Sequence, residues 1–172
     1  MTTRTVCVMI LLSICASCSD PWKPDPRFPT AEKIRGDALA AAKKEGKSAL
    51  LVFSMQGNNF CESLDRFHAD PVVWGVLGKH FVLGRVDIRE TPGGGEMLNE
   101  HGFADTAPAF SILDYKGMLL ANSSEGGQNF GFPNNEEQVA NYISAIKLAC
   151  PQMTDEEIAV LRNKLEPMRQ PE

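Results

Sequence analysis

The chain has 172 residues and a formal net charge of −5, with 43% hydrophobic and 23% charged residues. This length normally makes one domain with a sizeable core, and the composition is that of an ordinary globular protein. The acidic balance provides no basic surface for phosphates, so no nucleic-acid partner is expected.

The segment 1–17 has the pattern of a signal peptide. Arg4 is its only charge, and an apolar run from Val6 to Ala16 has the length of a secretory signal but is too short to span a bilayer. The following sequence CASC resembles the bacterial lipoprotein box. This resemblance implies that Cys18 is lipidated and that a lipid anchors the exported protein in the bacterial cell envelope, where it faces the periplasm or the cell exterior. Conventional cleavage, which leaves a soluble exported protein, is the alternative.

Residues 18–29 predict an extended, fairly stiff tether, because four prolines stand in the nine positions 21–29. Trp22 and Phe28 can dock onto the domain or meet a partner. The tether precedes a domain predicted over 30–150 and a C-terminal helical extension over 151–172.

Hydrophobic periodicity and turn residues predict the elements of this domain. Thr30 can cap the first helix, and Gly46 can end it. We expect a helix over 31–45, a strand over 48–54, a helix from about 59 that restarts at 70–71, a strand over 81–87, a flexible loop over 88–96, a short helix over 96–101, and strands over 109–114 and 118–122 joined by a tight turn.

A polar loop over 123–135 then leads to a helix that ends at Pro151, and the TDEE sequence at 154–157 is a capping box for a last helix. Helices and strands in this order predict an α/β fold. We expect a mixed sheet of four to five strands flanked by helices in three layers, in which the first strands are parallel and the last two form a hairpin.

The elements and turns resemble those of the thioredoxin-like fold family, and specifically its exported domains. The resemblance rests on AAAKKEGKSALLVF at 40–53, DPVVWGVL at 70–77 and FVLGRVD at 81–87. It covers about residues 31–150, and it implies a thioredoxin-like three-layer fold.

The resemblance also locates the redox motif of the family, which is degenerate here. Without a gap, Gly57 falls on the tryptophan, Asn58 on the first cysteine and Cys61 on the second, so the motif becomes Asn58-Asn59-Phe60-Cys61. An amide is no nucleophile, and a single thiol cannot complete a dithiol cycle alone. The buried acid of the family, which accepts a proton from the resolving thiol, falls on Val52.

The proline of the family's loop before the third strand is present, because Pro108 follows Ala107 in TAPAF. The resemblance implies a cis peptide bond there and a platform that presents the main chain of residue 107 to an extended peptide. A loop that merely leads into the strand is the alternative. The candidate peptide-binding residues are Gln56, Asn58, Asn59, Phe60, Ala107 and Pro108.

Cys61 has three possible roles: a structural core residue, a monothiol or redox-sensing group, or a partner in a disulfide with another protein. A disulfide with Cys150 is not expected, because Cys150 ends a helix that runs away from the edge where Cys61 lies. We expect Cys150 to be buried against the last helix.

Cys61, Asp65 and His68 share a helix face at spacings suited to metal ligation. The same spacing turns Leu64 and Phe67 towards the sheet, so we expect Asp65 and His68 nearer the surface. No second cluster of ligands is present in the sequence, and we predict neither a metal site nor a cofactor.

The sequence therefore predicts an exported, lipid-anchored thioredoxin-like protein that lacks the dithiol site and binds a protein or peptide in the cell envelope. The alternative is a monothiol disulfide reductase or isomerase that uses Cys61. A purely structural module on a tether is a third possibility.

Overall fold

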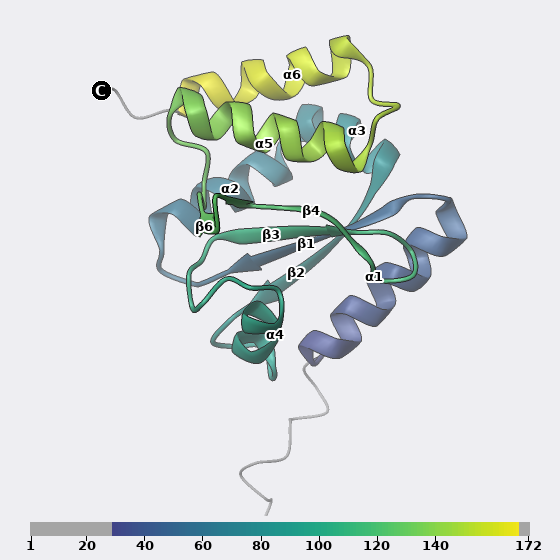
Figure 1. Ribbon diagram of the computed structural model, residues 1–172, viewed down its shortest axis with the longest axis vertical. Helices are drawn as coiled ribbons and strands as arrows, with labels where there is room; N and C mark the ends of the chain where they lie inside the picture. Colours follow the sequence, from purple (N-terminus) through teal and green to yellow (C-terminus); the bar gives the residue numbers. More distant parts are fainter. Residues whose placement is uncertain (1–28, 169–172) are drawn as a thin grey trace, which may run out of the picture.

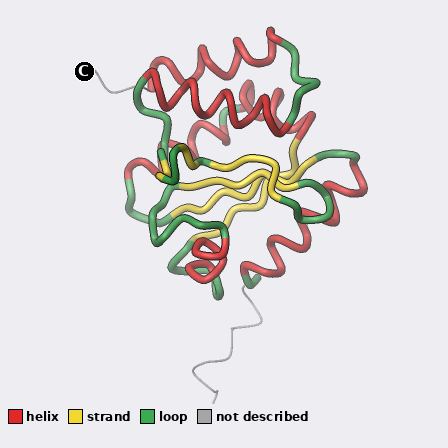
Figure 2. The backbone as a smooth tube through the Cα atoms, viewed as in Figure 1, coloured by secondary structure: helices red, strands yellow, loops and turns green. Residues whose placement is uncertain are grey.

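The computed structural model describes residues 29–168, which form a four-stranded mixed sheet between helices on both faces (Figures 1 and 2). The strands are β1 (Ser48–Ser54), β2 (Phe81–Asp87), β3 (Ala109–Leu113) and β4 (Leu119–Asn122), in the order β2-β1-β3-β4. β1 is parallel to β2 and antiparallel to β3, and β3 and β4 form an antiparallel pair. The predicted signal peptide, Cys18 and nearly all of the tether lie outside the described residues.

The helices are divided between the two faces of the sheet (Figure 1). α1 (Ala31–Glu45) and α4 (Gly94–Glu100) cover one face, and α2 (Asn59–Ala69), α3 (Pro71–His80) and α5 (Glu136–Ala149) cover the other. α6 (Asp155–Leu165) lies against α3 and α5, and a 3₁₀ turn, η1 (Glu166–Met168), follows it. The predicted three-layer α/β fold with a mixed sheet is confirmed.

Local signals explain where the helices begin and end. The hydroxyl of Thr30 accepts a hydrogen bond from the N–H of Lys33, and Gly46 ends α1 in the left-handed conformation with φ of +68°. Asp70 closes α2 and caps α3, because its carboxylate accepts from the N–H groups of Val72 and Val73. The predicted break at Asp70-Pro71 is therefore confirmed.

The loop after β2, which the sequence predicted to be flexible, is held by the carboxylate of Asp87. This carboxylate accepts hydrogen bonds from the N–H groups of Gln56, Arg89 and Glu90 at 2.9 to 3.1 Å. α4 also begins two residues earlier than predicted, at Gly94. Glycine is required there, since an added Cβ would lie 2.5 Å from the carbonyl oxygen of Asp87.

The predicted polar loop over 123–135 contains a short hairpin formed by β5 (Ser124–Glu125) and β6 (Gln128–Asn129). Gly126 and Gly127 make its turn with φ of +57° and +82°. The flanking residues are polar and lack alternating hydrophobicity, so the sequence pattern did not indicate strands.

The last helix belongs to the same hydrophobic cluster as α3 and α5. Ile158, Leu161 and Leu165 are buried in this cluster together with Cys150, as expected for that cysteine. Within residues 29–168, no helix is long and apolar enough to cross a bilayer.

Candidate functional site

The candidate site begins at the turn that follows β1. Gln56 is exposed at this turn, and its N–H donates to a carboxylate oxygen of Asp87 at 3.1 Å, which ties the turn to the end of β2. Gly57 has φ of +76°, a conformation that residues with side chains rarely adopt. The position that the resemblance assigns to a tryptophan is thus a glycine turn.

Asn58, at the position of the first cysteine in the family's motif, is the N-cap of α2. Its side-chain oxygen accepts hydrogen bonds from the N–H groups of Phe60 at 3.0 Å and Cys61 at 3.1 Å. Asparagine is among the best residues for this role, which is worth about 1 kcal/mol. The side chain therefore stabilises the helix and supplies no thiol for attack on a disulfide.

Cys61 is fully buried and is a free thiol, as is Cys150. Burial raises the pKa of Cys61, and hydrogen bonds with the Met55 main chain and the Ser54 hydroxyl oppose this rise. At neutral pH the group is consequently the protonated thiol, which is the poorly nucleophilic form.

A carboxylate nevertheless lies beside Cys61 on the same helix face, as the spacing of Cys61 and Asp65 in the sequence predicted, and its partners come from two strands. Asp65, one helical turn after Cys61, accepts a hydrogen bond from the Ser54 hydroxyl at 3.0 Å. The Arg85 guanidinium donates to both oxygens of Asp65, at 3.1 and 2.8 Å, and to Ser54 at 3.2 Å. The position of the family's buried acid, Val52, is apolar and buried as expected, but this network places another acid near the thiol.

The prediction that His68 lies nearer the surface is wrong. The His68 side chain is buried, with 4% of its surface exposed, and its Nε2 lies 3.1 Å from the Tyr142 hydroxyl on α5. Tyr142 supplies the hydrogen-bond partner that makes this burial tolerable. Within the described part of the chain, no group of three or more metal-binding side chains is arranged to hold an ion.

The Ala107–Pro108 loop forms the other side of the candidate site. Its peptide bond is cis, as the resemblance implies. Phe53 pairs with Ala109 across β1 and β3, and this antiparallel register places Ala107 near the turn that follows β1. Among residues 29–168, neither the N–H nor the C=O of Ala107 has a hydrogen-bond partner.

Asn129 holds this loop, and sequence reasoning missed it. Its side-chain NH₂ donates to the carbonyl oxygens of Thr106 at 3.2 Å and Pro108 at 3.0 Å. Its side-chain oxygen accepts from the buried Ser123 hydroxyl and from the N–H of Gly131. Asn129 and Pro108 are 21 residues apart, so no local pattern indicates the contact.

Replacing Asn129 with alanine is expected to lower the free energy of unfolding by about 2 kcal/mol, because several partly buried hydrogen bonds are lost together. Urea unfolding measures this change, and the amide NMR signals of Thr106 and Ala107 should broaden or shift. The matched control is Gln128→Ala in the same short strand, whose side chain is exposed. Equal stability of the two variants would contradict the assigned role.

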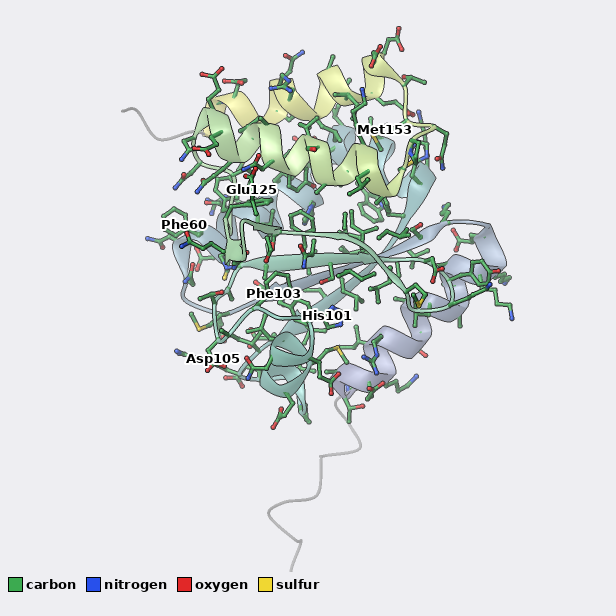
Figure 3. The ribbon with its side chains drawn as sticks, in the orientation of Figure 1. Phe60, His101, Phe103, Asp105, Glu125 and Met153 are labelled. Atoms are coloured by element: carbon green, nitrogen blue, oxygen red, sulfur yellow. The ribbon has the colours of Figure 1, made fainter. Side chains whose placement is uncertain are left out.

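Phe60 is the apolar member of the candidate site. It is 42% exposed and lines a small pocket of about 150 Å³, beside Phe132 and Asn134 from the loop that follows Asn129. Figure 3 shows Phe60 and Asp105, from the loop before Ala107, at the same end of the sheet. We call the surface formed by Gln56, Asn58, Asn59, Phe60, Ala107 and Pro108 the rim; Asn58 and Ala107 are half-buried within it, and Pro108 is buried.

No family model matches the sequence, and no curated protein matches it either. Among solved structures, a disulphide isomerase from Xylella fastidiosa Temecula1 is 20% identical with a TM-score of 0.51, and the match covers 83% of this chain and 95% of that chain. A DsbH oxidoreductase is 18% identical with a TM-score of 0.48, covering 76% and 92%. A thioredoxin from Thermus thermophilus is 23% identical with a TM-score of 0.45, covering 59% and 75%.

Proposed function

We propose that this chain, which has a thioredoxin-like fold, binds a protein or peptide in the cell envelope without dithiol chemistry. The observation that carries the proposal is the rim. It combines an exposed Phe60 with an Ala107 whose main-chain groups are unpaired within the described residues. Asn58, which occupies the position of an attacking thiol in the rim, caps α2 instead.

An extended peptide suits this surface chemically. The N–H and C=O of Ala107 can pair with the main chain of a peptide, as in recognition by strand addition. Phe60 and the small pocket beside it offer contact to an apolar side chain. Gln56, Asn58 and Asn59 are uncharged, so we propose that the preferred segment is extended, apolar and without a strong charge.

Binding of a reduced and carbamidomethylated polypeptide, which stays unfolded, has no free thiol and gains no charge, tests the proposal. Fluorescence anisotropy should show saturable binding, and the NMR signals of Gln56, Asn59 and Ala107 should shift. Phe60→Ala should weaken the affinity at least about fivefold. Val72→Ala, which truncates a similarly exposed residue on α3, should leave it unchanged. An absence of binding, or equal effects of both variants, would contradict peptide binding at the rim.

We further propose that the protein is exported and anchored through a lipid on Cys18, which the N-terminal pattern supports. Incorporation of a fatty-acid analogue should disappear in the Cys18→Ala variant. Label that persists in this variant would refute lipidation at Cys18.

A second candidate, a monothiol reductase or isomerase, is favoured by one observation. Asp65 and Ser54 form a hydrogen-bonded network beside Cys61, and a carboxylate in this place can accept a proton from the thiol. The complete burial of Cys61 and its raised pKa favour the structural role instead. Turnover of a disulfide substrate that is lost in Cys61→Ser would establish the enzyme.

Native Cys61 is expected to react with iodoacetamide at pH 7 at least about a hundred times more slowly than a free cysteine, because it is buried and protonated. Peptide mapping by mass spectrometry follows each cysteine separately, and unfolding in urea should restore the ordinary rate. Rapid alkylation of the native thiol that slows in Asp65→Asn would contradict the structural role and support the monothiol enzyme.

A further inference from the structure

Most of the exposed large hydrophobic side chains of the described residues lie away from the rim, on β4 and its surroundings. Five of the eight exposed large hydrophobic side chains in residues 29–168 are found there. Met118 and Leu119 are 66% and 52% exposed, and Leu148 on α5 is 69% exposed. We call this surface the β4 face; it consists of Tyr115, Met118, Leu119, Leu120 and Leu148.

β4 is also an edge of the sheet, since the strand order ends with it and no other described strand pairs with its outer side. Soluble proteins usually protect such an edge with charged residues or proline. Here no charged residue or proline occurs between Gly117 and Ser124. The β-bulge at Leu120 increases the local twist and limits any pairing to a short ladder, but it leaves the apolar side chains exposed.

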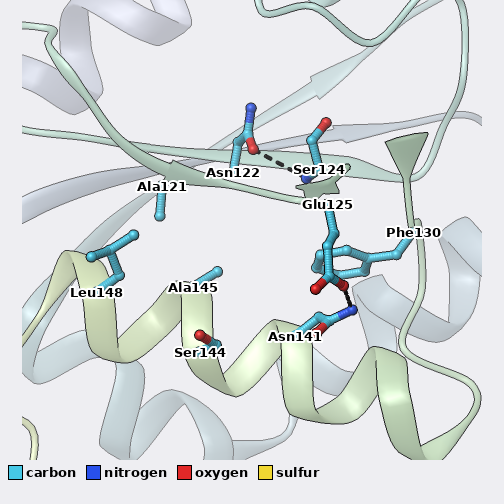
Figure 4. A pocket seen from close by; sticks show the side chains of 9 residues that line it. All are labelled: Ala121, Asn122, Ser124, Glu125, Phe130, Asn141, Ser144, Ala145 and Leu148. Carbon is cyan, nitrogen blue, oxygen red and sulfur yellow. Dashed lines mark hydrogen bonds between the residues drawn. The ribbon is translucent and has the colours of Figure 1, made fainter. Parts of the chain in front are cut away.

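A groove of about 210 Å³ runs beside the strand, between β4 and α5 (Figure 4). Ala121, Phe130, Ala145 and Leu148 form its apolar part, and the Asn141 side chain donates a hydrogen bond to Glu125 at its polar end. Small residues on both walls leave room for an apolar side chain from outside. The β4 face therefore offers both an unpaired main chain and a receiving groove.

The charges that flank β4 indicate which occupant fits. Lys116 lies four residues before Leu120, and Glu125 lies four residues after Ala121. Lys116 lies in the turn before β4, and Glu125 lies in β5 just after it. When two copies of β4 pair antiparallel about a two-fold axis between Leu120 and Ala121, the end of β4 next to Lys116 in each copy lies opposite the end next to Glu125 in the other. The face is thus apolar, and its flanking charges are opposite to those of a second copy placed against it. An isologous dimer interface requires such self-complementarity.

We propose that the β4 face joins two copies of this chain into a homodimer through antiparallel pairing of their β4 strands. The two four-stranded sheets then continue as one sheet across the two-fold axis. Met118 and Leu119 lose their contact with water in the pair. The interface is separate from the rim, so dimer formation does not depend on the proposed peptide binding.

Sedimentation equilibrium of the purified chain, in detergent if the lipid is retained, tests the proposal. The wild type should be a dimer at micromolar concentration. Leu119→Lys should raise the dissociation constant at least about thirtyfold, because it introduces two charges into the apolar interface. Val72→Lys, at an equally exposed aliphatic residue on α3, should not change it.

Charge reversal then tests the register. Lys116→Glu alone and Glu125→Lys alone should each raise the dissociation constant about tenfold, because every reversal affects two symmetry-related pairs. The double variant should restore it to within about twofold of the wild type. A monomeric wild type, a dimer insensitive to Leu119→Lys, or a double variant weaker than both single variants would overturn the proposal. Binding of the face only to an added foreign peptide would likewise overturn it.

Discussion

The Asn58→Cys variant is expected to gain dithiol chemistry, for which the wild type has only one of the two thiols of the motif. The new thiol stands at the N-cap of α2, three residues before Cys61, where the Asn58 side chain already reaches the N–H of Cys61 at 3.1 Å. A thiolate there is stabilised by the N-terminal N–H groups of the helix, and Cys61 can resolve the mixed disulfide that it forms. We expect disulfide reductase activity with dithiothreitol to rise at least about tenfold above background.

The control for this gain is the Asn58→Cys/Cys61→Ser double variant, which should form mixed disulfides and turn over more slowly, because only dithiothreitol can then resolve them. Loss of the helix cap should lower the free energy of unfolding by only about 1 kcal/mol, so both variants stay folded. A disulfide between the two cysteines in the single variant is detectable by mass spectrometry. Reactivity no higher than that of the wild type would mean that the turn does not hold the geometry of a redox motif.

Stability is expected to fall by about 3 kcal/mol between pH 7 and pH 4 because of one buried side chain, His68. Burial lowers the pKa of His68 from 6.5 to about 4. The unfolded chain therefore binds a proton at His68 below about pH 6.5, whereas the folded protein binds it only below about pH 4. Each pKa unit corresponds to about 1.4 kcal/mol, so the loss begins near pH 6.5 and is complete near pH 4.

Urea unfolding at several pH values measures this effect. The His68→Phe/Tyr142→Phe double variant removes the titrating ring together with its hydroxyl partner, and should lose most of the dependence between pH 6.5 and 4. Burial also lowers the pKa of His101, which adds a smaller effect of the same sign in both proteins. An equal slope in the two proteins would show that His68 is not held neutral.

Glu157 affects the stability in a lower pH range than His68. Hydrogen bonds from Lys79 and Thr154 help to lower the pKa of Glu157 from 4.5 to about 2. Its carboxylate therefore stabilises the fold above about pH 4.5, and that contribution is lost as the pH falls towards 2. Between pH 6.5 and 4.5, Glu157 consequently does not change the stability, and the pH dependence of stability in this range is due to the histidines.

The sequence by itself determined the helices, the strands of the four-stranded sheet and the layered α/β architecture, but not the short β5–β6 hairpin. Caps such as Thr30 and Asp70, the apolar run of β1 and the hairpin turn before β4 act over a few residues, so their effect is readable from neighbouring positions. The loss of the attacking thiol at Asn58 was visible for the same reason, because a motif of four consecutive residues carries it.

Only the tertiary structure decided which side chains meet at the candidate site. Asp65 joins Ser54 and Arg85 beside Cys61, although Arg85 is 20 residues further along the chain than Asp65. His68 meets Tyr142 across 74 residues, and Asn129 holds Pro108 across 21 residues. These contacts depend on how whole elements pack, since the partner of a buried polar group is chosen by the docking of helices and loops on the sheet. Sequence periodicity indicates which face is buried but not which atom lies opposite.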